Sequence, residues 1–168
     1  MDIIIRKYDS PCGTLLLGSY GDKLCLCDWE AARHCSRIAA RLKRALAAGI
    51  TEGGSAVTDT AARELDEYFG GRRKTFDLPL LFAGTDFQKR VWKTLLSIPY
   101  GTTVSYAELA RLTGMPKAVR AVANANGANA ISIFLPCHRV IGSNSSLTGY
   151  AGGLDAKGYL LELENHGL

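Results

Sequence analysis

The sequence changes pattern at residue 85, and this change limits the folds that the chain can adopt. Three short apolar runs near the N-terminus, separated by turn-forming residues, predict strands at 3–8, 14–20 and 23–29. Helical periodicity then predicts helices over 31–49 and 59–71, with a loop at 51–58 between them. We therefore expect residues 1–84 to form a small α/β domain, in which an antiparallel sheet carries helices and 74–84 is an extended connector.

From residue 85 onward the sequence carries clear helix-start signals. Thr85 with Gln88, and Ser105 with Glu108, have the spacing of capping boxes. Pro116 is well suited to be the first residue of a third helix. We expect a mainly α-helical domain over residues 85–168, which contains a helix-turn-helix. The apolar segment 131–135 is predicted to be a short buried strand, and 154–167 a closing helix.

Positive charge is concentrated in the second half of the chain. Residues 87–139 contain seven basic residues and one acidic residue, whereas residues 1–84 contain twelve basic and eleven acidic residues. A local excess of this kind is the footprint of a polyanion-binding surface. On charge alone, a solvated helix face is at least as good an interpretation.

The predicted third helix is rich in alanine, and Lys117 and Arg120 give it charge. A thin basic helix can approach a nucleic-acid backbone closely and can enter a narrow groove. The alternative is an alanine-rich helix that packs tightly on a neighbouring helix. Both interpretations are open at this point.

The segment PCHRVIG places Cys137, His138 and Arg139 in succession directly after a buried run. A reactive thiol needs a base or a cation nearby, because few thiols are ionised at neutral pH. Adjacent side chains rarely face each other, so a bridging water or a local bend would have to connect Cys137 with His138. The C-terminal helix offers Glu162 and Glu164 to fix the tautomer of the histidine. From the residues alone, an inert buried cysteine is as good an interpretation as a catalytic one.

The other four cysteines lie in the first 35 residues, and they could suggest zinc. We favour small buried hydrophobic residues over a metal site, because no Cys-x-x-Cys pair is present. The N-terminus lacks the features of a signal peptide, and no apolar run is long enough to span a membrane. These observations predict a cytoplasmic protein that does not bind membranes.

The chain resembles the O6-alkylguanine-DNA alkyltransferases in their stand-alone bacterial form. The resemblance covers the whole chain and rests on FQKRVW, IPYGTTVSYAELA, PKAVRAVANAN, PCHRV, TGYAGG and KGYLLELE. It implies a ribonuclease-H-like N-terminal domain and a winged helix-turn-helix. The sequence departs from the family pattern at Ala128, Ala130 and Tyr159, where arginine, proline and tryptophan are usual.

The resemblance also implies a reaction and its catalytic residues. Cys137 would accept a methyl or small alkyl group from guanine O6, and less readily from thymine O4, in an irreversible single turnover. His138 would deprotonate the thiol through a water, and Glu164 would orient the histidine. Tyr106 would protonate the departing base, and Asn129 would tie the helix-turn-helix to the active-site segment. No cofactor or metal is implied.

The partner implied by the resemblance is double-stranded DNA, bound through its minor groove with the damaged base flipped out. Arg120 would fill the space that the base leaves. Tyr150 and the backbones of Val140 and Ala151 would form the base pocket, and Ser143 would lie near the DNA backbone. We expect a monomer, and whether it binds DNA cooperatively is left open. Two rival functions are a Cys-His thiol hydrolase and a non-catalytic helix-turn-helix regulator with a redox thiol.

Overall fold

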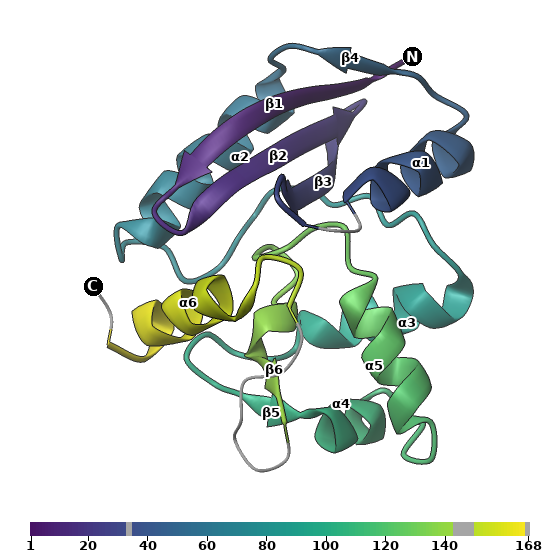
Figure 1. The fold of residues 1–168 in the computed structure, drawn as a ribbon, viewed down its shortest axis with the longest axis vertical. Coiled ribbons are helices and arrows are strands. Elements are labelled where there is room, and N and C mark those ends of the chain that lie inside the picture. The colour runs from purple at the N-terminus through teal and green to yellow at the C-terminus, as the bar shows by residue number, and fades with distance from the viewer. Residues whose placement is uncertain (33–34, 143–149, 167–168) are drawn as a thin grey trace.

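A computed structural model describes residues 1–32, 35–142 and 150–166 of the chain. It contains an N-terminal sheet domain and a helical C-terminal domain, which lie one above the other in Figure 1. No helix in the described residues is long and apolar enough to cross a membrane.

The N-terminal sheet has four strands in the order β3-β2-β1-β4. The strands are β1 (Ile3–Ser10), β2 (Gly13–Tyr20), β3 (Lys23–Trp29) and β4 (Ile50–Glu52). The three predicted strands are confirmed and pair antiparallel through tight turns. The strand β4 was not predicted. Its three residues are all exposed, and it exists because it pairs in parallel with the start of β1.

Two helices belong to this domain, α1 (Cys35–Leu46) and α2 (Ala56–Phe69). The predicted start of α2 at Asp59 is wrong by three residues. The helix begins earlier because the Ser55 hydroxyl accepts a hydrogen bond of 3.1 Å from the Thr58 amide. The Thr58 hydroxyl in turn accepts a bond of 3.0 Å from the Ser55 amide. A threonine thus completes a capping box that usually uses Glu or Gln.

The C-terminal domain contains α3 (Asp86–Leu95), α4 (Tyr106–Leu112), α5 (Val119–Gly127), a short 3-10 helix η1 (Cys137–Arg139) and α6 (Leu154–His166). Two short parallel strands, β5 (Val104–Ser105) and β6 (Val140–Ile141), join α4 to the active-site segment. The capping box of Thr85 and Gln88 is confirmed. Ser105 also caps α4, but the Glu108 carboxylate pairs with Arg111.

Two predictions for this domain are wrong. Helix α5 begins at Val119 rather than Pro116, because the chain first forms a turn in which the Ala118 amide bonds the Met115 carbonyl at 2.9 Å. Residues 131–135 are buried as expected, but they form a tight turn and not a strand. Ile133 has a φ of 74°, and the Leu135 amide bonds the Ile131 carbonyl at 2.9 Å.

The outer edge of β3 joins the two domains. The amide and carbonyl of Cys27 bond Ala130 and Ser132 at 2.9 and 2.7 Å. The connector residues Pro79 and Leu81 bond Leu24 on the same strand in the same way. The segment that leads into the active site is therefore fixed to the N-terminal sheet by main-chain bonds. A boundary at residues 84 and 85 stays a prediction.

Candidate active site

Cys137 is the first residue of η1, and only 7% of its surface is exposed. It follows the buried turn at 131–135, and its amide bonds the Leu135 carbonyl at 2.7 Å. The thiol is therefore held on a rigid, buried support.

Asn129 connects the end of α5 with this thiol. Its Nδ2 donates to the Leu135 carbonyl at 3.1 Å and to the Cys137 Sγ at 3.2 Å. Its Oδ1 accepts from the Ile131 amide at 2.8 Å. A buried amide with both ends engaged fixes the sulfur relative to the end of α5.

His138 is completely buried, and its Nε2 lies 2.7 Å from Oε2 of Glu164 on α6. A carboxylate at this distance favours the tautomer with the proton on Nε2. The other ring nitrogen, Nδ1, is buried without a hydrogen-bond partner among the described residues. In that tautomer Nδ1 carries a free lone pair and can accept a proton. Glu162, the other carboxylate considered from the sequence, is exposed.

Glu164 is the centre of a buried polar network. Oε2 accepts from His138, from the Tyr68 hydroxyl at 2.6 Å and from Nη2 of Arg139 at 3.1 Å. Oε1 accepts from Nε of Arg139 at 2.8 Å and from the Gly101 amide at 3.4 Å. Burial alone would raise the pKa of Glu164, but the bonds from His138 and Arg139 hold this pKa well below its ordinary value of 4.5. The carboxylate therefore stays ionised.

The thiol and the imidazole are both neutral at rest. Burial raises the pKa of Cys137 to about 11, although the hydrogen bond from Asn129 and the positive charge of Lys157 oppose the rise. Burial also lowers the pKa of His138 below 6.5, although Glu164 favours its protonation. Because a thiol with this pKa is protonated at neutral pH, the site needs a base that acts during the reaction.

Lys157 on α6 is completely buried, and its Nζ donates to the Val140 carbonyl at 2.7 Å. Burial lowers its pKa, and the nearby Cys137 opposes that shift. The Val140 side chain is buried too, and it does not line the cavity described next. The carbonyl that the sequence assigned to a base pocket is thus already bonded to a lysine.

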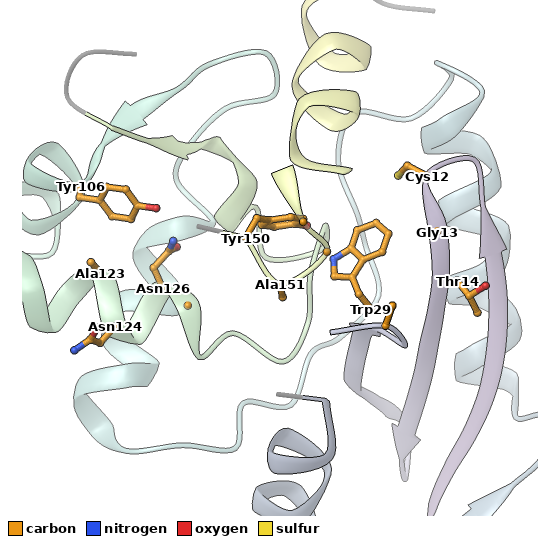
Figure 2. A pocket seen from close by; sticks show the side chains of 14 residues that line it. Cys12, Gly13, Thr14, Trp29, Tyr106, Ala123, Asn124, Asn126, Tyr150 and Ala151 are labelled. Carbon is orange, nitrogen blue, oxygen red and sulfur yellow. The ribbon is translucent and has the colours of Figure 1, made fainter. Parts of the chain in front are cut away.

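A cavity of about 820 Å³ opens beside this site. Figure 2 shows Tyr106 at one end, Tyr150, Ala151 and Trp29 in the middle, and the β1–β2 turn at the other end. Trp29 and Tyr150 meet edge to face with ring centroids 6.0 Å apart. The aromatic walls suit a flat heterocyclic ligand, and Asn124 and Asn126 on α5 add polar groups to the lining.

The outer face of α5 carries the predicted DNA-binding residues. Arg120, Ala121, Asn124 and Gly127 are exposed at helical spacing, so this face is thin apart from the arginine. Lys117 is exposed in the turn before the helix. Ser143, the remaining predicted contact, lies outside the described residues.

Three residues of the site were not identified from the sequence: Tyr68, Lys157 and Trp29. Tyr68 belongs to the amphipathic pattern of α2, where an aromatic residue predicts core packing. Its partner Glu164 is 96 residues away along the chain, so no local spacing connects them. Lys157 lies in the KGYLL segment, where a lysine on a helix is usually exposed.

The cysteines at positions 25 and 27 are completely buried on β3, and Cys25 Sγ lies 3.5 Å from the Gly18 carbonyl. No group of three or more His, Cys, Asp or Glu residues in the described part of the chain is arranged to hold a metal ion.

Comparisons with known proteins agree with this geometry. A family model described as 6-O-methylguanine DNA methyltransferase, ribonuclease-like domain, matches residues 3–82, and one described as its DNA binding domain matches residues 86–166. A methylated-DNA–protein-cysteine methyltransferase of Mycobacterium leprae is 42% identical over 161 residues, which cover 96% of this chain and 92% of that protein. One from Methanosarcina barkeri is 57% identical over 108 residues, or 64% of this chain and 68% of that protein.

A solved structure described as Mycobacterium tuberculosis OGT in complex with DNA matches with a TM-score of 0.84 and 43% identity. The match covers 96% of this chain and 92% of that chain. The similarity therefore extends through both domains, and this chain belongs to the methylated-DNA–protein-cysteine methyltransferase family.

Proposed function

We propose that this protein repairs DNA by moving a methyl or small alkyl group from guanine O6, and less readily from thymine O4, to Sγ of Cys137. The observation that carries the proposal is the arrangement of the thiol, the imidazole and the carboxylate. Cys137 is held by Asn129, and it precedes a histidine whose Nε2 is engaged by Glu164 and whose Nδ1 has no partner in the described residues.

The first step is removal of the thiol proton. In the tautomer fixed by Glu164, Nδ1 of His138 accepts this proton, and we infer that a water relays it from Sγ. The imidazolium that forms is stabilised by the ionised Glu164, 2.7 Å from Nε2. Burial that keeps His138 neutral at rest makes it available as a base at neutral pH.

The second step is alkyl transfer. The sulfur forms a bond with the alkyl carbon while the bond from that carbon to O6 breaks, and the electron pair of this bond stays with guanine. Tyr106 donates a proton to the departing guanine, and solvent restores the phenol. Because water does not displace the sulfur of a thioether under physiological conditions, each molecule reacts once. No cofactor takes part.

The base enters the site by leaving the duplex stack, because its O6 substituent is out of reach inside the helix. Tyr150 and Ala151 line the cavity that would hold it. A contact of the base with the Val140 backbone stays a prediction, because the Val140 carbonyl already accepts a bond from Lys157. Arg120 is exposed at the start of α5 and would fill the space that the base vacates.

The thin outer face of α5 favours the minor groove of double-stranded DNA, which is narrower than the major groove. Ser143 would lie near the DNA backbone. We infer that α4 and α5 form a winged helix-turn-helix, in which β5 and β6 supply part of the wing. The N-terminal sheet with α1 and α2 would then be a ribonuclease-H-like domain. We expect a cytoplasmic monomer.

Intact-protein mass spectrometry tests the proposal. The protein is mixed with a short duplex that carries one O6-methylguanine, and the mass of the chain is followed. We expect a gain of one methylene group, located at Cys137, that stops at one group per molecule. Cys137→Ala should bind the duplex without gaining mass, whereas Cys25→Ala should react normally.

Other outcomes would support other functions. If the duplex is bound and no mass is gained, the chain is a damage-binding protein with an idle thiol. If there is neither binding nor a mass gain, the thiol hydrolase becomes the better interpretation. Repeated turnover of a thioester substrate would then be the measurement to make.

A further inference from the structure

Glu164 is shared between the two domains. Helix α6 lies beneath the end of α2 in Figure 1, and the hydroxyl of Tyr68 on α2 donates to Oε2 of Glu164 at 2.6 Å. The same oxygen lies 2.7 Å from Nε2 of His138. The N-terminal domain therefore contacts the acceptor atom on which the base of the reaction depends.

We propose that Tyr68 is a positioning residue for alkyl transfer, which orients the Glu164 carboxylate and limits the basicity of His138. This inference rests on the proposed function, because it assigns a role in the reaction at Cys137. Tyr68 acts through Glu164 and His138 and does not touch the thiol.

The orientation argument follows from the lone pairs of the carboxylate. Arg139 holds both oxygens with its planar guanidinium, Nε to Oε1 at 2.8 Å and Nη2 to Oε2 at 3.1 Å. This fork aligns the carboxylate, and two shorter bonds remain on Oε2, one from His138 and one from Tyr68. Without the tyrosine hydroxyl, the Arg139 fork still holds the carboxylate, but Oε2 loses its shortest bond and can shift its position relative to the imidazole.

The basicity argument follows from competition for one oxygen. A carboxylate oxygen that shares its charge with a second donor accepts more weakly from the first. The Tyr68 hydroxyl therefore weakens the bond that favours protonated His138. If the hydroxyl is removed, His138 and Nη2 of Arg139 are the remaining donors to Oε2. More of the charge of Oε2 then acts on the imidazole, and His138 becomes easier to protonate.

The Tyr68 hydroxyl is held in place by packing and stays protonated, so it remains a hydrogen-bond donor. It is completely buried, and its ring lies 5.2 Å from Phe69, 5.5 Å from Phe76 and 6.3 Å from Tyr100, centroid to centroid. Burial and the charge of Glu164 raise the pKa of its hydroxyl far above the ordinary value of 10.0. The group therefore keeps its proton throughout the pH range in which the protein would act.

The test is Tyr68→Phe, which keeps the ring and removes the donor. Single-turnover methyl transfer is measured at several protein concentrations and pH values. We expect the limiting rate constant to fall by at least about threefold, because the base is less well aligned. The rate constant falls at low pH as His138 becomes protonated. We expect this fall, the acid limb of the pH profile, to move to higher pH by about half a unit in the variant. The protein concentration at half-saturation should not change, because Tyr68 is buried away from solvent.

Two matched controls remove the same atom elsewhere. Tyr100→Phe deletes a hydroxyl in the same aromatic cluster that bonds the Leu163 carbonyl at 3.4 Å instead of Glu164. Tyr8→Phe deletes a hydroxyl that donates to Asp66 on α2 at 2.6 Å, so it matches the loss of a bond to a carboxylate. Both variants should keep the pH profile of the unaltered protein.

A second variant gives a change of opposite sign and does not remove the bond. Replacing Tyr68 by 3-fluorotyrosine makes the hydroxyl a stronger donor, so the acid limb should move to lower pH. A purely structural role would not move the limb in opposite directions in the two variants. This variant also decides the matter if Tyr68→Phe does not fold.

The possible outcomes distinguish failure of the proposed function from failure of the role assigned to Tyr68. If the unaltered protein transfers no methyl group, the proposed function fails. If it does react, and Tyr68→Phe and the fluorotyrosine variant both match Tyr100→Phe in rate and pH profile, Tyr68 only packs and the inference is overturned.

Discussion

Glu164 is 5% exposed, and its carboxylate is surrounded by donors from α2, η1 and the loop before β5, whereas Arg120 and Lys117 at the start of α5 are exposed. The structure gives neither basic residue a hydrogen bond or an ion pair with another described residue. In the proposed function the two regions serve the same reaction, one by moving a proton and the other by holding DNA.

The difference follows from the dielectric environment of each region. A buried charge is costly unless it is fully paired, and once paired it interacts strongly with its neighbours. An exposed lysine or arginine costs little, but salt screens it and its interactions are weak. Substitutions in the buried region should therefore have large effects on rate and folding. Loss of an exposed charge that only contacts phosphate, as expected of Lys117, should have a small effect that depends on salt.

The largest effect is expected from His138→Gln. Glutamine can still donate to Glu164, but it has no atom that accepts the thiol proton, so transfer should slow by about 10² to 10⁴-fold. Affinity for the duplex should stay the same, because His138 is completely buried. Single-turnover rates and a binding titration on the same duplex measure both quantities. A loss of rate that is explained by weaker binding would contradict the assignment of His138 as the base.

The next largest effect is expected on the free energy of unfolding, from Glu164→Gln. This change leaves the buried Arg139 guanidinium without a counter-charge, which typically costs about 3–5 kcal/mol. The free energy of unfolding in urea at neutral pH measures the loss. Glu108→Gln is the control, because Glu108 and Arg111 form an exposed pair on α4, and no comparable loss is expected there.

The stability difference between the original protein and Glu164→Gln should also depend on pH. The pKa of Glu164 is lower in the folded state than its ordinary value of 4.5, so the unfolded chain takes up the proton first as the pH falls. The stability that Glu164 contributes is complete above pH 4.5 and is lost as the pH falls below it. The free energies of unfolding of the original protein and of Glu164→Gln should converge below this pH. A constant difference down to pH 3 would show that the carboxylate is not held ionised by its partners.

Local signals in the sequence predicted much of the fold. The capping box at Thr85 and the three N-terminal strands depend on residues close together in the chain, and all are confirmed. The strand β4 and the turn at 131–135 depend on partners far away, namely β1 and the edge of β3. Apolar composition alone could not distinguish that turn from a strand.

Prediction of the site residues was limited in the same way, by contacts between residues that are distant in the chain. Cys137 and His138 are neighbours in the sequence, and a carboxylate on the last helix was expected, so the proton path could be proposed before the structure. Tyr68 could not, because its bond to Glu164 depends on how α2 packs against α6. Lys157 was missed because a lysine on a helix predicts solvent exposure, and here it is buried against the Val140 carbonyl.

The smallest effect is expected from Lys117→Ala on the DNA-binding face. If the exposed ammonium neutralises one phosphate, its removal should lower affinity similarly on all duplexes and reduce the slope of log affinity against log salt by about 0.9. Titrations at several salt concentrations measure the slope. Lys23→Ala removes an equal charge from an exposed site at the start of β3, on the N-terminal sheet, and should leave the slope unchanged. Equal changes in the two variants would mean that the net charge of the protein, and not contact at α5, sets the salt dependence. The exposed face of α5 would then have no special part in holding DNA.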